Sequence, residues 1–434
     1  MATTPSPQIH GHTEAGFESV RELFERNMRR WAEEHAQLCV YHKGLKVVDL
    51  WGSKNDAGGF DADSLINVFS SGKSLEAIAL AHLAGQGYID YQAPIANYWP
   101  EFAQNGKDFV TVADLMRHEA GLANFEFSII PEDLHVDRLK ANAIGAQIEI
   151  HPQHFNNPSQ TKREYHALTR GWIANELFRR TDPKGRTIGE FIRDEISTPL
   201  DADIAIGVNQ TQLESRVPIT PLPVLKHFLA TLRPRILGRK VLHNTIQLFG
   251  RLSKLVLSLM RRPQKKWPVP FEGMSGIAFF NEPVIAMGET PSANTSASAR
   301  GLAKIAAAMA AGGRLDNATI LPSESWNLLH SAPTKANMGG FLPCEFTQGG
   351  VNFYRPCTDT SSKLERAFNV GREGFYGWMG LGGSLFQWHP EHDIGFAFVP
   401  TSLHMLDLLN ERGKEYQAEV LRCVEAIFNH TRMT

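Results

Sequence analysis

The stretch VFSSGKSLEAIAL, residues 68–80, carries the strongest local signal in this sequence. An apolar, strand-like approach from Leu65 to Phe69 runs into Ser70, and a nearly continuous run of small apolar residues follows it. That pattern predicts a helix packed in the interior. Ser70 stands at the start of the helix and Lys73 three residues later, so both side chains project from the same side. The sequence therefore predicts a buried helix that begins with a paired hydroxyl and amine.

The pairing of Ser70 with Lys73 suits nucleophilic catalysis. A serine hydroxyl is a poor nucleophile until a neighbouring base accepts its proton. A lysine amine can be that base where burial keeps it neutral, and a helix N-terminus supplies a backbone N–H for a developing oxyanion. The structural alternative is a serine that caps the helix beside a solvated lysine. A second S-x-x-K copy, Ser159 to Lys162, lies in a polar segment with no apolar helix behind it, and we interpret it as a loop.

Length and composition bound the class of protein. The 434 residues are 42% hydrophobic and 21% charged, which at about 100–200 residues per domain gives two or three globular domains and excludes disorder. A net charge of −2 offers no general basic field for nucleic acid. The four scattered cysteines show neither a disulfide framework nor zinc spacing. With no secretory signal and no apolar stretch long enough to span a membrane, we expect a cytoplasmic protein.

The two ends of the chain share one pattern. A helix is predicted from Phe17 to Trp31, followed by a hairpin over 38–51, and near the other end a hairpin over 383–399 precedes another helix. The ends are therefore expected to build one antiparallel sheet with helices packed on it, an α+β fold. Residues 1–90 plus 290–434 would form this sheet domain. Residues 91–289, mostly helical in pattern, would form an inserted helical domain.

A basic apolar segment, 220–270, interrupts the helical half. Its 41 residues from Lys226 to Lys266 hold eleven Lys/Arg, no Asp or Glu, and apolar residues at helical intervals. Three interpretations stay open: peripheral contact with an anionic membrane or lipid through 226–266, a lid over an apolar pocket, and a packed helix pair with a solvated basic face. Nucleic acid is not favoured, because no recognised module accompanies the patch.

Several motifs together resemble one family. The Ser70–Lys73 motif, VTVADLMRHEAGL at 110–122, EYHA at 164–167, a segment from Pro291 to Ala303 and YGWMGLGGS at 376–384 resemble the class C β-lactamase-like serine hydrolases. The motifs fall in the family's order along nearly the whole chain. The resemblance implies a β-lactamase/transpeptidase-like fold, an antiparallel sheet flanked by helices with an inserted helical domain. The active site would lie in the cleft between them.

The resemblance also implies roles for individual residues. Ser70 would be acylated, Lys73 would accept its proton, and Tyr165 would act as general acid and base. The oxyanion would be held by the backbone amides of Ser70 and Leu381, with Trp378 and Gly380 beside the substrate. No metal and no organic cofactor would be needed.

Two departures from the family pattern narrow the expected substrate. Trp378 stands where the β-lactamase motif has a cationic residue, and Ala167 stands where it has an asparagine. Losing a cation and an amide removes polar anchors for a charged, peptide-like substrate, and tryptophan adds apolar surface. A small neutral ester fits better. In this respect the chain is similar to bacterial carboxylesterases of β-lactamase type and related acyltransferases.

The leading hypothesis is a serine hydrolase that cleaves carboxylic esters through an acyl-enzyme on Ser70. One alternative is transfer of the same acyl group to an alcohol or amine. The other is a non-catalytic protein that keeps the fold for lipid contact or assembly. Weaker motifs receive structural interpretations: HPEHD at 389–393 as an exposed turn rather than a metal site, and His118 and His166 as hydrogen-bonding residues. The oligomeric state stays open.

Overall fold

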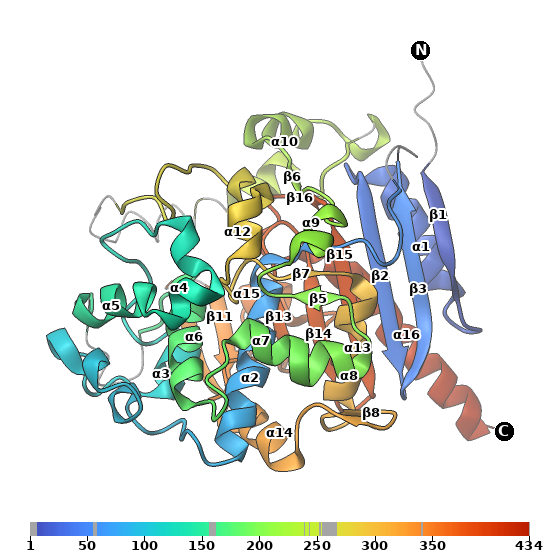
Figure 1. Ribbon diagram of the computed structural model, residues 1–434. Coiled ribbons are helices and arrows are strands. Elements are labelled where there is room, and N and C mark those ends of the chain that lie inside the picture. The colour runs from blue at the N-terminus through green and yellow to red at the C-terminus, as the bar shows by residue number, and fades with distance from the viewer. Residues whose placement is uncertain are drawn as a thin grey trace.

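A nine-stranded antiparallel sheet forms the backbone of the structure (Figure 1). The computed structural model describes residues 7–433 apart from 55–58, 156–161, 238, 243, 251–252, 254–266 and 340–341. The strands lie in the order β1-β3-β2-β15-β14-β13-β12-β11-β10. Their bounds are β1 Gln8–Thr13, β2 His35–His42, β3 Leu45–Ser53, β10 Thr334–Met338, β11 Leu342–Phe346, β12 Asn352–Phe353, β13 Tyr376–Met379, β14 Leu385–His389 and β15 Ile394–Pro400.

The two ends of the chain meet at the centre of this sheet. Strand β15 pairs antiparallel with β2 over seven residue pairs, among them Phe396 with Val40. The hairpin β2–β3 and the hairpin β14–β15 are thereby joined edge to edge. The expectation that both ends build one antiparallel α+β sheet is confirmed.

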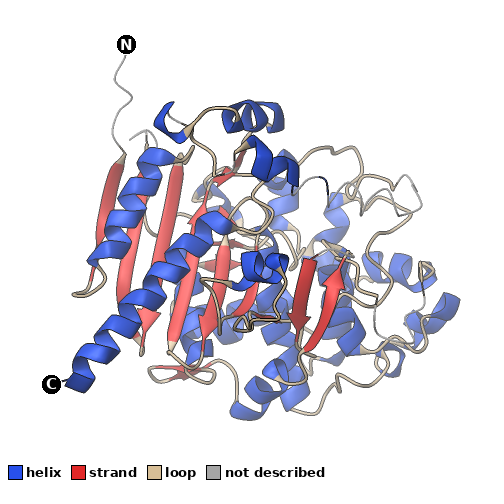
Figure 2. Ribbon diagram, turned by 180° about the vertical axis from the view of Figure 1, so that it is seen from behind, coloured by secondary structure: helices blue, strands red, loops and turns tan. Residues whose placement is uncertain are grey.

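Strands β2 and β15 are buried on both faces. Leu38 and Val40 pack into the apolar cluster that also contains residues of the first and last helices. Their neighbours Cys39 and Tyr41 belong to the cluster on the opposite face, because successive side chains in a strand point to opposite sides. Figure 2 shows α1 (Glu18–Arg30) and α16 (Glu411–Met433) lying across one face. Helix α13 (Ala299–Ala310) covers the other face and contacts β2, β14 and β15.

Helices fill most of the remaining chain, and Figure 1 shows α3 to α6 grouped at the end of the molecule away from β1. The buried helix predicted after Ser70 is α2, and α3 and α6 belong to the stretch 91–289 that is mostly helical in pattern. The bounds are α2 Lys73–Gly85, α3 Val112–Met116, α4 Val136–Lys140, α5 Ala143–Ile150, α6 Thr169–Thr181, α7 Ile188–Ile192, α8 Thr198–Leu200, α9 Gln210–Glu214, α10 Val224–Thr231, α12 Pro283–Met287, α14 Ser323–His330 and α15 Lys363–Asn369. The division into a sheet domain and a helical domain stays a prediction.

Short strand pairs tie distant segments together. A three-stranded sheet places β7 (Ser296–Ala297) between β4 (Ile66–Asn67) and β5 (Ile204–Ala205). Strand β6 (Thr220–Pro221) pairs in parallel with β16 (Ser402–Leu403), and β8 (Arg314–Leu315) pairs with β9 (Ala318–Thr319). The strand-like approach predicted before Ser70 is therefore β4, which is held by a segment more than two hundred residues later.

Two features singled out in the sequence lie partly or wholly outside the described residues. Ser159 is one of them. Of the basic apolar segment 226–266, the structure describes 226–237, 239–242, 244–250 and 253. Across the described ranges, no helix combines the length and apolar character that a bilayer span requires. All four cysteines are free.

Candidate active site

Ser70 lies in a 3₁₀ turn, η1 (Phe69–Gly72), between β4 and α2. Phe69, directly before it, has a φ of +49°, a left-handed conformation that bulky residues rarely adopt and that concentrates at functional sites. Hydrogen bonds on both sides of Val68 hold the turn: its N–H donates to the Thr295 carbonyl at 2.9 Å, and its carbonyl accepts from Ser384 Oγ at 2.6 Å. The surrounding structure thus fixes the serine at the start of α2.

Gly72 in the Ser70–Lys73 motif is required by a close approach. A Cβ at this position would lie 2.3 Å from Thr295 Oγ1 and 2.9 Å from the Pro291 carbonyl oxygen. The first turn of α2 therefore packs directly on the segment 291–295. This segment is the start of the motif from Pro291 to Ala303 that resembles the family.

Lys73 is buried behind Ser70, with 1% of its surface exposed. Its Nζ lies 3.5 Å from Ser70 Oγ, and it donates to the carbonyls of Ala167 at 2.7 Å and Ser292 at 3.0 Å. Burial lowers the pKa of the amine well below its usual value, the negative charge of Glu76 opposes this shift, and Arg170 adds to it.

Tyr165 reaches the same place from the segment before α6. Trp378 Nε1 donates to its hydroxyl at 2.9 Å, and Lys73 Nζ lies 4.9 Å from the centre of its ring. Removal of the phenol from water raises the pKa of Tyr165 to about 12, against smaller opposing effects of its hydrogen bonds with Ser70 and Trp378. The hydroxyl therefore stays protonated near neutral pH.

Two histidines hold the segment that carries Tyr165. The backbone N–H groups of Glu164 and His166 donate to the carbonyl and to Nδ1 of His118, at 3.0 and 3.1 Å. Leu122 N–H donates to His166 Nε2 at 3.1 Å. Burial lowers the pKa of His166 to about 3, so the ring is a neutral acceptor. Both histidines position Tyr165 through the backbone.

A buried ion pair lies under the lysine. Glu76, one turn further along α2, binds Arg170 of α6, and both side chains are fully buried. The guanidinium also donates to the carbonyls of Lys73 at 2.9 Å and Met116 at 2.9 Å, and Ser292 Oγ donates to Glu76 at 2.8 Å. These contacts join α2, α6, the end of α3 and the segment 291–295 around one charge pair.

The loop after β13 closes the other side of the serine. A Cβ on Gly380 would lie 2.4 Å from the Val68 carbonyl, so the loop packs directly on the turn that carries Ser70. Asn410 Nδ2 donates to the Ser384 carbonyl at 3.0 Å, and Arg412 Nη2 donates to the Gly382 carbonyl at 2.7 Å. Asn410, just before α16, and Arg412, within α16, therefore hold the loop that contains Leu381.

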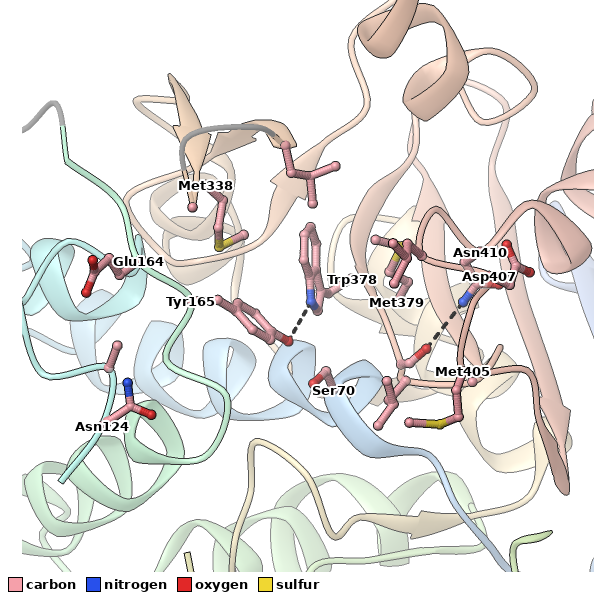
Figure 3. Close-up of a pocket in the computed structure, with 17 residues that line it drawn as sticks. Ser70, Asn124, Glu164, Tyr165, Met338, Trp378, Met379, Met405, Asp407 and Asn410 are labelled. Carbon is pink, nitrogen blue, oxygen red and sulfur yellow. Dashed lines mark hydrogen bonds between the residues drawn. The ribbon is translucent and has the colours of Figure 1, made fainter. Parts of the chain in front are cut away.

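These segments enclose a cavity of about 360 Å³ (Figure 3). Figure 3 shows Ser70 at its floor, between Tyr165 and Trp378 on one side and Met405 on the other. The lining is mostly apolar, and the described lining residues include two acids but no lysine or arginine. They are Ser70, Ala123, Asn124, Glu164, Tyr165, Met338, Gly339, Leu342, Trp378, Met379, Gly380, Leu381, Gly382, Met405, Asp407, Leu408 and Asn410.

Comparison with known proteins identifies the family. The family model described as Beta-lactamase matches residues 20–418. The chain belongs to the beta-lactamase family. It is 30% identical over 385 residues to the esterase/beta-lactamase LipL of Mycobacterium tuberculosis. The aligned region covers 84% of this chain and 76% of the relative. This family resemblance was the one expected from the motifs.

Solved structures of the same fold support the assignment. A penicillin-binding protein homologue from Caulobacter crescentus superposes with a TM-score of 0.70 at 25% identity, covering 96% of this chain and all of that one. A family VIII carboxylesterase gives a TM-score of 0.71 at 24% identity with the same coverage. The predicted β-lactamase/transpeptidase-like fold is confirmed.

The structure brings the sequence-predicted site residues together. Ser70, Tyr165, Trp378, Gly380 and Leu381 line one cavity, with Lys73 directly behind the serine. Sequence reasoning missed Glu76, Arg170 and Ser292. A single acid inside an apolar helix was a usable signal for Glu76, since such a residue needs a buried partner. The cavity residues Asn124 and Met405 come from irregular segments and Met338 ends β10, and their spacing carried no signal.

The HPEHD sequence forms the β14–β15 turn, as expected, but it is not fully exposed. His389 is buried at the end of β14, packs edge-on against Phe375, and accepts a hydrogen bond from the N–H of His392. The ring is buried because it lies on the sheet rather than in the turn. In the described parts of the chain, no group of three His, Cys, Asp or Glu side chains is arranged to hold a metal ion.

We expect Arg170→Met to lower the free energy of unfolding by about 3–5 kcal/mol, because it leaves the Glu76 carboxylate buried without its partner. Urea unfolding followed by tryptophan fluorescence measures the change. Lys184→Met, which removes an exposed ion pair with Glu195, is the control and should change little. If both substitutions lowered the free energy of unfolding equally, the buried Glu76–Arg170 ion pair would have no special role in stability.

Proposed function

We propose that this chain is a serine hydrolase that cleaves neutral carboxylic esters through an acyl-enzyme on Ser70. The observation that carries the proposal is the buried Lys73 amine at 3.5 Å from Ser70 Oγ, beside a protonated Tyr165, at the floor of an apolar cavity. The esterase/beta-lactamase relative and the carboxylesterase of the same fold support it.

The hydrogen bonds of Lys73 leave its lone pair for the serine. A neutral amine has two N–H donors, and the Ala167 and Ser292 carbonyls accept both. The remaining lone pair is free to take the proton of Ser70 as the hydroxyl oxygen attacks the ester carbonyl. Burial, which lowers the pKa of Lys73, supplies the neutral form at working pH.

Tyr165 serves the leaving alcohol. Its hydroxyl oxygen accepts from Trp378, so its own proton is free to be donated into the cavity. A cation at position 378 would stabilise phenolate, whereas the neutral indole leaves the phenol protonated. As the tetrahedral intermediate collapses, the C–O bond to the alcohol breaks and the alkoxide takes a proton from Tyr165, which is replenished from Lys73.

Backbone amides of Ser70 and Leu381 would hold the negative carbonyl oxygen of the intermediate. Both residues line the cavity, and the close packing of Gly380 on Val68 keeps the two chain segments adjacent. Water then adds to the acyl carbon and gives a proton to the neutral Lys73 amine. As the bond between the acyl carbon and Ser70 Oγ breaks, the serine oxygen takes that proton back and the carboxylic acid leaves.

The charge of the cavity selects the substrate. Glu164 and Asp407 are among the residues that line it, with no lysine or arginine among the described lining residues, and Met338, Met379 and Met405 supply adaptable apolar surface. A substrate carboxylate would find no lysine or arginine among the described lining residues to bind it. It would also meet the two acids, of which Glu164 lies 3.9 Å from Lys162 and Asp407 accepts from the backbone N–H groups of Glu411 and Arg412. A neutral ester with an apolar acyl or alcohol part meets no charge repulsion in the cavity and removes apolar surface from water when it binds.

Acylation of Ser70 tests the proposal directly. We expect wild type to hydrolyse p-nitrophenyl butyrate and to gain the mass of one butyryl group on Ser70 in rapid-quench mass spectrometry, while Ser70→Ala shows neither. Ser159→Ala removes the serine of the other S-x-x-K copy and should retain full activity. Equal activity of wild type and Ser70→Ala would disprove the function. Product analysis with an added alcohol separates hydrolysis from acyl transfer.

The pH dependence should follow Lys73. We expect kcat/KM to rise with pH through the lowered pKa of the amine, since protonated Lys73 cannot accept the serine proton. It should then stay level through the alkaline range, because Tyr165 loses its proton only near pH 12. Stopped-flow assays across pH measure the profile. A fall of kcat/KM as pH rises through neutrality would make the protonated amine the active form and contradict the scheme.

The acidic lining predicts discrimination by charge. A p-nitrophenyl succinate monoester, similar in length to the butyrate but carrying a carboxylate, should be hydrolysed at least about tenfold less efficiently, the cost of roughly 1.4 kcal/mol of repulsion. Glu164→Gln should narrow the difference by removing one of the two charges. Equal kcat/KM for the two esters in wild type would show that the cavity does not select by charge.

A further inference from the structure

Residues 224–237, 239–242 and 244–249 form an exposed apolar surface at one edge of the molecule, which we call the 224–249 surface. Figure 1 shows α10 at the periphery, above β6 and β16. Eight of the seventeen large apolar side chains that the described residues leave exposed lie here. They are Val224, Leu225, Leu229, Leu232, Ile236, Leu237, Ile246 and Phe249.

The amphipathic pattern of α10 is inverted. Leu225 and Leu229, four residues apart on one face, are 70% and 53% exposed, while the polar His227 and Thr231 on the other face are each 2% exposed. A helix that faces water presents its polar side outward. Ile236 at 97% and Ile246 at 84% extend the exposed apolar face beyond the helix. Such a concentration of apolar side chains marks an interaction surface.

The buried side anchors this surface to the fold. The ring of His227 packs edge-on against His404, just after β16, with ring centres 5.8 Å apart. Thr231 Oγ1 lies 3.1 Å from Thr245 Oγ1, which ties α10 to the next helical stretch, and Leu248 in that stretch is fully buried. The exposed leucines therefore belong to a fixed face.

The charged side chains of the segment itself have one sign. Lys226, Arg233 and Lys240 are exposed within it, and no Asp or Glu occurs between Glu214 and Glu272. Basic side chains interleaved with exposed leucines complement a surface that is anionic outside and apolar inside. A symmetric contact between this surface and the same surface of a second copy would bring like charges together and is not favoured.

We propose that the 224–249 surface is a binding site for an anionic lipid bilayer. Its leucines and isoleucines enter the region between headgroups and acyl chains, and its lysines and arginines contact the headgroup phosphates. Strand β16, on which the surface rests through His404, leads directly into Met405 and Leu408 of the cavity wall. Bilayer binding would thus place the cavity near a reservoir of apolar molecules.

Co-sedimentation with vesicles tests the proposal without reference to catalysis. We expect the full chain at low ionic strength to bind phosphatidylglycerol/phosphatidylcholine vesicles at least about tenfold more tightly than vesicles of phosphatidylcholine alone. Lys226→Glu with Arg233→Glu should weaken binding about tenfold or more, and Leu225→Ser with Leu229→Ser should weaken it to a similar degree. Molar salt should release the protein, because it screens the headgroup charge.

Matched control variants distinguish binding by this surface from non-specific adsorption to vesicles. Leu45→Ser removes a leucine that is 70% exposed at the start of β3, and Lys363→Glu reverses an exposed lysine on α15. Both should bind vesicles as wild type does. No preference for anionic vesicles, or equal loss in the control variants, would overturn the proposal. So would a dimer that Leu225→Ser with Leu229→Ser converts to monomer while vesicle binding stays absent.

Discussion

The burial of Lys73 is the constraint on which the rest of the site depends. Its amine is held by the carbonyls of Ala167 and Ser292, so three segments far apart in the chain must meet at one atom. Taking an ammonium out of water is costly, and the cost lowers the pKa of the lysine. In the proposed mechanism, this burial keeps the amine neutral, so that it can accept the proton of Ser70.

The ion pair of Glu76 and Arg170 stabilises that arrangement from below. Its guanidinium donates to the carbonyls of α2 and α3, and its carboxylate accepts from Ser292, whose own carbonyl binds Lys73. A buried pair of this kind adds little net stability compared with apolar residues, but breaking it is expensive. Its contribution here is geometric, because it fixes the position of the carbonyls that receive the lysine.

The cavity and the 224–249 surface share one chemistry. The cavity is lined by methionines and leucines, and the surface exposes leucines and isoleucines. The two are connected through β16, His404 and Met405. They differ in charge: the described cavity lining is acidic, whereas the surface is basic. An apolar neutral substrate is compatible with both, since it carries no charge that either would repel.

The local elements and the candidate nucleophile Ser70 could be predicted from the amino-acid pattern alone. Hydrophobic periodicity placed the terminal hairpins, α1, α2 and α16, because a strand or helix must bury one face whatever its partner is. Motif order predicted Ser70, Lys73, Tyr165, Trp378 and Leu381 as site residues. Their surroundings could be seen only in the folded protein. The carbonyls on Lys73 and the Arg170 pair are contacts across 94 to 219 residues of chain, and local pattern carries no information about partners at that separation.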